Sequence, residues 1–302
     1  MNNLHLNLND FRNASRVLKE AETISRFSII NHVFIAALCG PNTKKFEKVN
    51  SKITINRFEL KSRNLGKNFF FQCVKYFEFS LRIILYYLHK DVKVINVHSV
   101  KLLPLGYLLK SMYHAKYIYD AHELETETHG LTGLRKKLLK LIERILIKKA
   151  DQVFVVSESI ADWYQSEYGI KRPIVLLNAP RYTASSYGNY FRNQFAVRND
   201  QKIVLYQGNL KPNRGIEELI AAFIDRENKS PVLVFMGDGT LKEWILNVSA
   251  RCPNIFLHDA VPPENLLNYS ASADLGIHLI PNTCLNHNFC MPNKLFEYLM
   301  AG

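Results

Sequence analysis

Short apolar runs alternate with amphipathic stretches along most of the chain, and this alternation restricts the fold more than any other feature. In residues 1–180 the apolar runs predict strands over Leu4–Leu8, Val33–Leu38, Val92–Val97, Lys116–Tyr119, Val153–Val156 and Ile174–Leu177. The stretches between them predict helices over Ser15–Arg26, Asn68–His89, Leu102–Met112, Leu134–Lys149 and Ser159–Tyr168. Strands that alternate with helices are typical of parallel βαβ units, so we expect an α/β fold.

The alternation stops at a polar, loop-like stretch, Asn178–Gln201, and then restarts. The second series predicts strands over Ile203–Tyr206, Val232–Met236, Ile255–Leu257 and Leu275–Leu279. It predicts helices over Ile216–Phe223, Leu241–Ala250 and Glu264–Ser270, and a last helix that opens near Asn293. We therefore predict two Rossmann-like domains, residues 1–180 and 181–302. Because no strand follows the last helix, we expect the second domain to be incomplete and the chain to be truncated at its C-terminus.

The first candidate site is the segment Tyr206–Gly215, which ends a predicted strand, turns and opens a helix. A helix N-terminus attracts phosphate through its free N–H groups and the helix dipole. Gly208 allows a close approach of the backbone, and Arg214 can add charge-assisted hydrogen bonds to a diphosphate. Many strand-to-helix turns carry Gly and Arg, so a purely structural turn is an equal alternative at this point.

The second candidate site is the segment Met291–Gly302. Pro292 suits the first turn of a helix, where a missing N–H costs little. Glu297 falls about one turn further along, where a carboxylate can accept hydrogen bonds from both hydroxyls of a ribose. A surface position without a ligand is the alternative for Glu297.

The third candidate site is the segment Tyr119–Glu123, at the carboxyl end of a predicted strand. Ligands of open α/β sheets bind at such strand ends. His122, with acids such as Asp120 and Glu123 nearby, can position a substrate or move a proton. A solvated acidic loop is the alternative.

Taken in chain order, the three segments resemble the retaining glycosyltransferases of family 4, which have the GT-B fold. The same family pattern is similar to the segments Asn9–Ala21, Ala150–Glu158, Val175–Asn178, Gly237–Gly239 and Ala273–Ile277. The resemblance implies transfer of a sugar from a nucleotide-diphosphate donor, most simply a UDP-sugar, with retention of configuration. It implies no cofactor and no metal, and it supplies no carboxylate nucleophile. We expect attack on the front face of the sugar, assisted by the leaving phosphate.

The resemblance also implies roles for individual residues. Arg214 would contact the donor diphosphate, Glu297 would bind the donor ribose, and His122 would contact the transferred sugar as the catalytic residue. The implied donor-binding set is Gly208, Asn209, Arg214, Gly237, Asp238, Asn293, Lys294, Leu295 and Glu297. The implied acceptor-side set is Asn13, Arg16 and Glu123.

Two positions depart from the family pattern. The first Glu of its E-x7-E motif would fall at Phe289, so that contact to the sugar must come from elsewhere. The usual Arg after the glycine of the diphosphate turn is Asn209, which leaves Arg214 as the cation of that turn.

The net positive charge of the chain comes entirely from its first part. Residues 1–180 hold 28 Lys and Arg and 16 Asp and Glu, a difference of +12, whereas residues 181–302 hold 11 of each. We expect the basic domain to bind the acceptor, a glycan or a lipid-linked or anionic glycan of a bacterial envelope. The basic helix Gly133–Lys149 predicts contact with an anionic membrane, with its leucine and isoleucine stripe packed in the domain core. Lysines that only aid solubility are the alternative.

Several observations bear on the compartment and on the aromatic helix. The five cysteines are irregularly spaced, and residues 1–10 lack the pattern of a signal peptide. The most apolar stretch, Phe69–Leu88, is too polar for a bilayer core, and we expect this aromatic-rich helix to be buried against a sheet. These features predict a cytoplasmic protein, peripheral on the inner face of the plasma membrane.

Other functions are weaker matches. Cys284, His287 and Cys290 lack a standard zinc spacing, the Gly237–Gly239 turn lacks the dinucleotide fingerprint, and no nucleic-acid module is recognisable. A sugar-nucleotide 2-epimerase of similar fold and an inactive truncated fragment remain as alternatives to a glycosyltransferase of polysaccharide biosynthesis.

Overall fold

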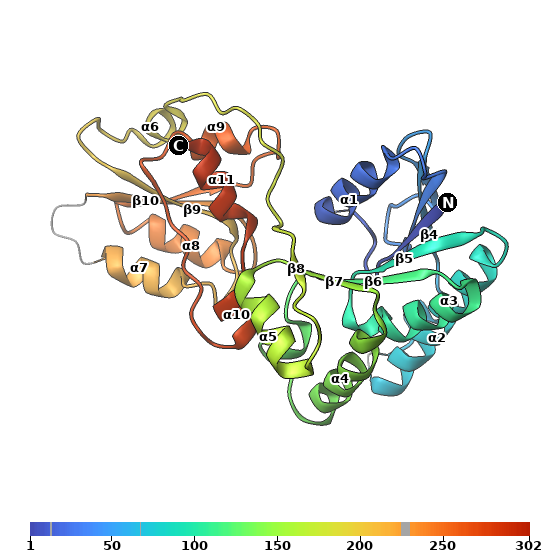
Figure 1. Ribbon diagram of the computed structural model, residues 1–302. Coiled ribbons are helices and arrows are strands. Elements are labelled where there is room, and N and C mark those ends of the chain that lie inside the picture. The colour runs from blue at the N-terminus through green and yellow to red at the C-terminus, as the bar shows by residue number, and fades with distance from the viewer. Residues whose placement is uncertain (13, 67, 225–229) are drawn as a thin grey trace. The chain divides into compact units, whose positions relative to one another are not determined.

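The computed structural model of the protein describes residues 1–12, 14–66, 68–224 and 230–302. The chain divides into two compact units, Met1–Leu177 and Asn178–Gly302, and each contains a parallel sheet with helices (Figure 1). The α/β fold class predicted from the sequence is therefore confirmed. The sequence-based prediction put the division after residue 180.

The first unit is built on one sheet in the order β3-β4-β2-β1-β5-β6-β7-β8. Every neighbouring pair is parallel except β3 with β4, so the carboxyl ends of the parallel strands open on one edge. The strands are β1 (Asn2–Leu6), β2 (His32–Leu38), β3 (Phe46–Lys48), β4 (Ile53–Phe58), β5 (Val92–Val97), β6 (Lys116–Ala121), β7 (Gln152–Val155) and β8 (Ile174–Val175). The strands β3 and β4 were not predicted from the sequence.

Five α-helices of this unit were predicted, with ends that differ by a few residues. They are α1 (Ser15–Ser25), α2 (Phe69–Tyr87), α3 (Leu103–Tyr113), α4 (Gly133–Leu146) and α5 (Glu158–Tyr168). The side chain of Asn68 accepts a hydrogen bond from the backbone N–H of Phe71 and so starts α2. Ser157 starts α5 in the same way, and Gly169, with a φ of 60°, ends it.

The second unit has a four-stranded sheet in the order β11-β10-β9-β12, and all its pairs are parallel. Its strands are β9 (Ile203–Asn209), β10 (Val232–Asp238), β11 (Ile255–Asp259) and β12 (Leu275–Gly276). Its helices are α6 (Tyr190–Phe195), α7 (Ile216–Ile224), α8 (Lys242–Ser249), α9 (Leu266–Ser270), α10 (Leu285–Phe289) and α11 (Asn293–Ala301).

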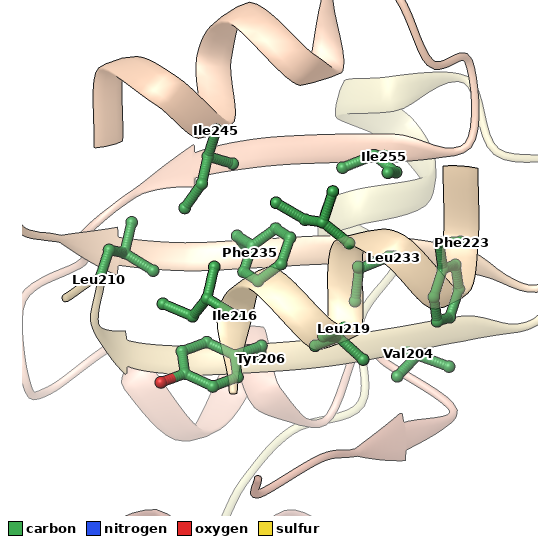
Figure 2. Packing of buried hydrophobic residues seen from close by; sticks show 11 residues of the cluster. Val204, Tyr206, Leu210, Ile216, Leu219, Phe223, Leu233, Phe235, Ile245 and Ile255 are labelled. Atoms are coloured by element: carbon green, nitrogen blue, oxygen red, sulfur yellow. The ribbon is translucent and has the colours of Figure 1, made fainter. Parts of the chain in front are cut away.

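Alternate residues of β9 and β10 pack on opposite faces of this sheet, as the two-residue period of a strand requires. Tyr206 and Phe235 point to the face covered by α7 and α8, where Ile216 and Ile245 lie over them (Figure 2). The opposite face packs against α6, α9 and α11. Both faces of the sheet are therefore covered, and its strand ends are left to form a site.

The stretch predicted to be only loop contains α6. Phe191 on this helix is fully buried and packs in the core that includes Ile203, Leu205 and Val234. Phe195 and Val197 pack in the same core, so a few apolar side chains within a polar stretch fold the segment onto the sheet.

The two conspicuous helices of the first unit differ from expectation. On α2 the aromatic residues Phe79 and Tyr87 are buried, but Phe70 and Phe77 are about two-thirds exposed, at 68% and 70%. On α4 the apolar stripe is also largely exposed, and Glu143 is the buried residue of the helix. The prediction that both apolar faces serve the core is wrong in these parts, and the unit presents an apolar surface on α2 and α4.

Within the described residues, none of the helices combines the length and the apolar character needed to cross a bilayer.

Candidate functional site

The carboxyl ends of β9 and β10 come together at two glycines. Gly208 pairs with Gly237 across the strands, and a Cβ on Gly237 would overlap the carbonyl oxygen of Gly208. The following Asp238 is exposed, and its Oδ1 accepts a hydrogen bond of 2.9 Å from the backbone N–H of Gly239. The exposed Asn209 lies opposite Asp238 in the register. The strand ends are therefore close-packed backbone that side chains larger than hydrogen would disrupt.

Arg214 lies in the turn between β9 and α7, and this turn packs against the segment after β12. Gly215 has a φ of 73°, and a Cβ there would lie 2.6 Å from the Cγ of Leu279. This close contact holds Arg214 near His278, which also follows β12, since the Arg214 charge helps to lower the pKa of His278.

The start of α11 approaches the end of β9. Pro292, in an extended conformation, precedes the first turn, which contains Asn293, Lys294 and Leu295. A Cβ on Gly208 would lie 3.6 Å from the Lys294 Nζ, so the ammonium group sits directly at the glycine turn. Within the described residues, no side chain caps this helix start. Its first-turn N–H groups carry the partial positive charge of a helix N-terminus.

The electrostatics of this cluster favour an anion. Burial and then the Arg214 charge lower the pKa of Lys294 to about 8. Burial and the charges of Lys294 and Arg214 lower the pKa of His278 to about 4, so His278 is neutral at pH 7. Among the described residues, neither Lys294 nor Arg214 has a carboxylate within ion-pair distance. Two half-buried cations without a direct ion pair, beside a helix N-terminus, can hold a phosphate or diphosphate.

Glu297 lies one turn further along α11 and is fixed by a buried glutamine. The Gln207 Nε2 donates to the Glu297 Oε2 at 2.6 Å, and the Gln207 Oε1 accepts from the Ser270 hydroxyl at 2.5 Å. Burial raises the pKa of Glu297, although the bond from Gln207 opposes this. The neighbouring Tyr298 anchors the helix, because its hydroxyl accepts from the Gln207 N–H and donates to β9 and to Ile277.

In the first unit, His122 directly follows β6 and lies at the end of a buried polar network. Its Nε2 is 2.7 Å from the Asp120 Oδ2, and the His98 Nδ1 is 3.1 Å from the same oxygen. The His5 Nδ1 lies 2.8 Å from the His98 Nε2. His5 and His98 are fully or almost fully buried, whereas the His122 side chain is 31% exposed.

The hydrogen bonds of this network fix the protonation of its rings. Asp120 accepts from Arg16, His98 and His122, and these partners hold its pKa well below the usual range against the opposing effect of burial. Burial lowers the pKa of His98 and of His5, so both are neutral. His98 then donates from Nδ1 to Asp120 and accepts at Nε2 from His5, and His122 donates from Nε2 to Asp120. Asp120 therefore orients His122, whose Nδ1 takes no part in these bonds.

The acceptor-side residues expected from the sequence have different environments. Arg16 is buried, and its Nε and terminal nitrogen donate to both oxygens of Asp120, at 2.9 and 2.6 Å. A third nitrogen donates to the Leu176 carbonyl at 2.8 Å. Arg16 thus holds the sheet together and is not presented to a ligand. Glu123 is exposed beside His122, and Asn13 lies outside the described residues.

Within the described residues, two groups of side chains have the spacing of metal ligands, and both belong to this network. They are His5 with Glu20 and His98, and His98 with Asp120 and His122. Both oxygens of Asp120 already accept from Arg16, so the second group is an ion-pair network in its chemistry. Cys284, His287 and Cys290, on or beside α10, do not appear among the ligand clusters of the described residues.

Sequence reasoning missed His278 as a member of the donor cluster and missed Gln207 and His98 altogether. His278 and His98 each follow a strand by one or two residues, so the rule that sites lie at the carboxyl ends of strands could have found them. Gln207 had no such signal, because its role depends on a partner 90 residues away.

Solved structures show which fold class this arrangement belongs to. Sucrose-phosphate synthase from Thermosynechococcus elongatus matches with a TM-score of 0.70 and 17% identity, over 91% of this chain and 74% of that chain. Anabaena Alr3699/HepE in complex with UDP matches with a TM-score of 0.71 and 12% identity, over 100% of this chain and 79% of that chain. A structure from Escherichia coli is described as trehalose-6-phosphate bound with UDP-2-fluoro glucose. It matches with a TM-score of 0.69 and 12% identity, over 100% of this chain and 82% of that chain. At these identities the likeness establishes the fold, which is that of the GT-B glycosyltransferases.

The family follows from the sequence of the first unit. Residues 31–179 match the family described as Glycosyltransferase Family 4. The resemblance found in the sequence is therefore confirmed: the protein is a GT-B glycosyltransferase of family 4. Among curated proteins, none matches the chain.

Proposed function

We propose that the protein transfers a sugar, with retention of configuration, from a UDP-sugar to a glycan or lipid-linked acceptor. The observation that carries the proposal is the pair of cations without a direct ion pair, Lys294 at the start of α11 and Arg214 in the turn after β9. Two of the three solved structures support the donor class, since they were obtained with UDP and with UDP-2-fluoro glucose.

The cations act on the leaving group. When the bond between the anomeric carbon and the diphosphate breaks, its electron pair stays on the diphosphate oxygen, where negative charge grows. Lys294, Arg214 and the first-turn N–H groups of α11 are already oriented toward such a charge, so they stabilise the transition state more than the ground state. We propose that these groups act without a divalent metal. The acceptor hydroxyl bonds to the anomeric carbon on the same face and passes its proton to the departing phosphate oxygen.

The remaining roles follow from the surroundings of each side chain. Glu297, with one carboxylate oxygen held by Gln207, offers the other to the ribose hydroxyls. His122, held at Nε2 by Asp120, presents Nδ1 to a hydroxyl of the transferred sugar. The acceptor binds on the basic first unit, which meets it at the inner face of the plasma membrane.

The donor site is tested by the ligand dependence of stability. Calorimetry should detect UDP binding in EDTA, and UDP should raise the thermal midpoint of the protein. Arg214→Gln should weaken UDP binding about tenfold or more, because the guanidinium faces the diphosphate. Arg251→Gln is the control, since Arg251 is an exposed arginine of the same unit. Equal UDP binding by the two variants would contradict the donor site.

The reaction is tested with the products of UDP-glucose, UDP-galactose and UDP-N-acetylglucosamine, followed by NMR with and without added acceptor. Retention predicts a product with the anomeric configuration of the donor. Release of an epimerised sugar in the absence of acceptor would replace the transferase with a sugar-nucleotide 2-epimerase.

A further inference from the structure

A groove of about 980 Å³ lies in the first unit, apart from the His122 network. It runs between α2 and α4, which lie side by side in Figure 1, and reaches the loops that follow β1 and β2. Ligand pockets range over roughly 300–1,000 Å³, so this groove has room for a large ligand. Its apolar lining includes Phe58, Phe69, Phe77, Phe79, Leu138 and Ile142.

The walls of the groove are unusually exposed for apolar side chains. Phe77 and Leu138 line it, and they are 70% and 42% exposed. The apolar surface continues outward on the same two helices, where Phe70 and Leu141 are 68% and 53% exposed. A contiguous exposed apolar surface of this kind marks an interaction site for an apolar partner.

The charged side chains that line the groove indicate the charge of that partner. Four cations line it, Arg63, Lys75, Lys101 and Arg135. The one lining carboxylate, Asp10, already accepts a hydrogen bond of 2.7 Å from the Arg12 guanidinium.

Within the described residues, these cations make no direct ion pair. Arg63 and Lys75 donate to backbone carbonyls, and Glu59 and Glu125 feel the charges of Arg63 and Lys101 from a greater distance. Lys101 and Arg135 are exposed and, within the described part of the chain, have no carboxylate at ion-pair distance. The groove therefore combines an apolar interior with a surplus of positive charge, which complements a hydrocarbon chain that ends in a phosphate.

The position of the groove relates it to the candidate acceptor side. The loops after β1 and β2 contribute Asn9 and Gly40, and these strands end on the same edge of the sheet as β6. His122 follows β6, and β5 alone lies between β1 and β6 in the sheet. Lys101 follows β5, so a chain whose phosphate meets Lys101 has that end at the edge of the sheet that carries His122.

We propose that this groove binds the hydrocarbon chain of a lipid-phosphate-linked acceptor, with its phosphate against Lys101 and Arg135. The inference rests on the proposed transferase function and narrows its acceptor from a glycan in general to a glycan carried on a lipid phosphate. The exposed apolar side chains outside the groove then face the membrane from which the carrier is drawn.

The probe is farnesyl phosphate below its micelle concentration, titrated into the full chain by calorimetry. Each buried methylene changes affinity by roughly fourfold, so geranyl phosphate, shorter by five carbons, should bind at least about tenfold more weakly. Farnesol, without the phosphate, and inorganic phosphate, without the chain, should each bind at least about tenfold more weakly than farnesyl phosphate.

Matched variants separate the groove from the surrounding surface. Leu138→Gln and Leu141→Gln replace two exposed leucines of α4, of which Leu138 alone lines the groove. Phe77→Gln and Phe70→Gln form the corresponding pair on α2. The groove variants should weaken binding of farnesyl phosphate about tenfold, and their partners by less than twofold. All four side chains are substantially exposed, so circular dichroism should show folded proteins.

A further pair of variants tests the phosphate contact. Arg135→Gln should weaken binding of farnesyl phosphate about fivefold and leave binding of farnesol unchanged. Lys137→Gln, an exposed cation of α4 that does not line the groove, should change neither.

Each contrary result has a definite meaning. No binding of farnesyl phosphate would overturn the inference and would leave an amphipathic protein segment as the occupant to consider. Equal losses in the groove variants and their partners would also overturn it, in favour of general adsorption to a lipid surface. UDP binding distinguishes the two proposals: its persistence without lipid binding removes only this inference, and its absence removes the transferase.

Discussion

The Lys294 Nζ lies 3.9 Å from the centroid of the Tyr206 ring, at the carboxyl end of β9. The ring provides the ammonium group with a cation–π contact, and the charge of Glu297 favours it, but burial and the nearby Arg214 oppose its charge. The ammonium is thus held at the glycine turn in the absence of a ligand, at the expense of stability. A diphosphate would supply the missing negative charge.

Replacement of Lys294 by methionine should stabilise the free protein. The pKa of Lys294 falls from 10.5 to about 8 on folding, which corresponds to a penalty of about 3 kcal/mol below pH 8. This penalty disappears as the pH rises from 8 to 10.5, because the unfolded chain alone then binds the proton. We expect Lys294→Met to raise the thermal midpoint by several degrees at pH 7 and to weaken UDP binding. A lower midpoint together with unchanged UDP affinity would show that the lysine is structural.

The affinity for UDP should depend on pH through the same group. Below pH 8 Lys294 is charged and attracts the diphosphate, and above pH 8 it loses its proton in the free protein. The dissociation constant should therefore rise about tenfold between pH 7 and pH 9. Titration calorimetry at both values measures this, and Lys294→Met should show little change over the range. His278, with a pKa of about 4, stays neutral throughout and adds nothing.

Glu297→Gln tests the ribose contact while the helix is preserved. The new amide oxygen can still accept from the Gln207 Nε2, so the thermal midpoint of the free protein should change little. A neutral amide accepts weaker hydrogen bonds from hydroxyls than a carboxylate does, and UDP affinity should fall about tenfold. Affinity for inorganic pyrophosphate, which has no ribose, is the control and should stay the same. Parallel losses for both ligands would place Glu297 at the phosphates instead.

Strands with continuous apolar sequence were predictable, and a strand with buried polar residues was not. The run Val232–Met236 is continuously apolar, and the strand predicted there is observed as β10, Val232–Asp238. In β4 the polar residues Asn56 and Arg57 are buried. Asn56 donates to the Tyr87 hydroxyl and Arg57 to the carbonyl of Asp10, and such distant partners leave no mark on the local pattern.

The candidate sites were likewise predictable only in part. The carboxyl-end rule and the family motif together identified Arg214, Lys294 and Glu297, which the structure places in one unit around the same strand ends. Arg16 was expected on the acceptor side, and the sequence did not reveal its partner, because the ion pair with Asp120 joins residues 104 positions apart. A motif reports which residue types recur, whereas the partner of a buried charge is set by the packing of the sheet.

Arg16→Ala should destabilise the first unit strongly. Loss of the guanidinium leaves Asp120 buried without its cation, and removal of one partner of a buried ion pair costs about 3–5 kcal/mol. Arg172→Ala is the control, since Arg172 also bonds two carboxylates, Glu158 and Asp162, but at the surface, where loss of an ion pair changes stability little. Chemical denaturation measures both, and UDP binding by the second unit should survive in each. Similar small losses in the two variants would restore Arg16 as a candidate acceptor contact.

The buried Glu143 should make the first unit less stable as the pH rises. Its carboxyl group accepts hydrogen bonds from Tyr119, Tyr164, Tyr168 and Thr126, but burial outweighs them and raises its pKa. The folded state therefore binds the proton more tightly than the unfolded chain, and stability falls as the pH rises from 4.5 through the folded pKa. Glu143→Gln should remove this dependence, whereas Glu158→Gln, at an exposed carboxylate of the neighbouring helix α5, should keep it. Glu143→Ala, which leaves the four hydroxyl groups without their acceptor, should cost about 2–4 kcal/mol at pH 4.5 and less as the pH rises. Hydrogen exchange of the α5 amides between pH 4.5 and 7.5 measures the dependence. An identical pH slope in the wild type and Glu143→Gln would mean that Glu143 is ionised throughout.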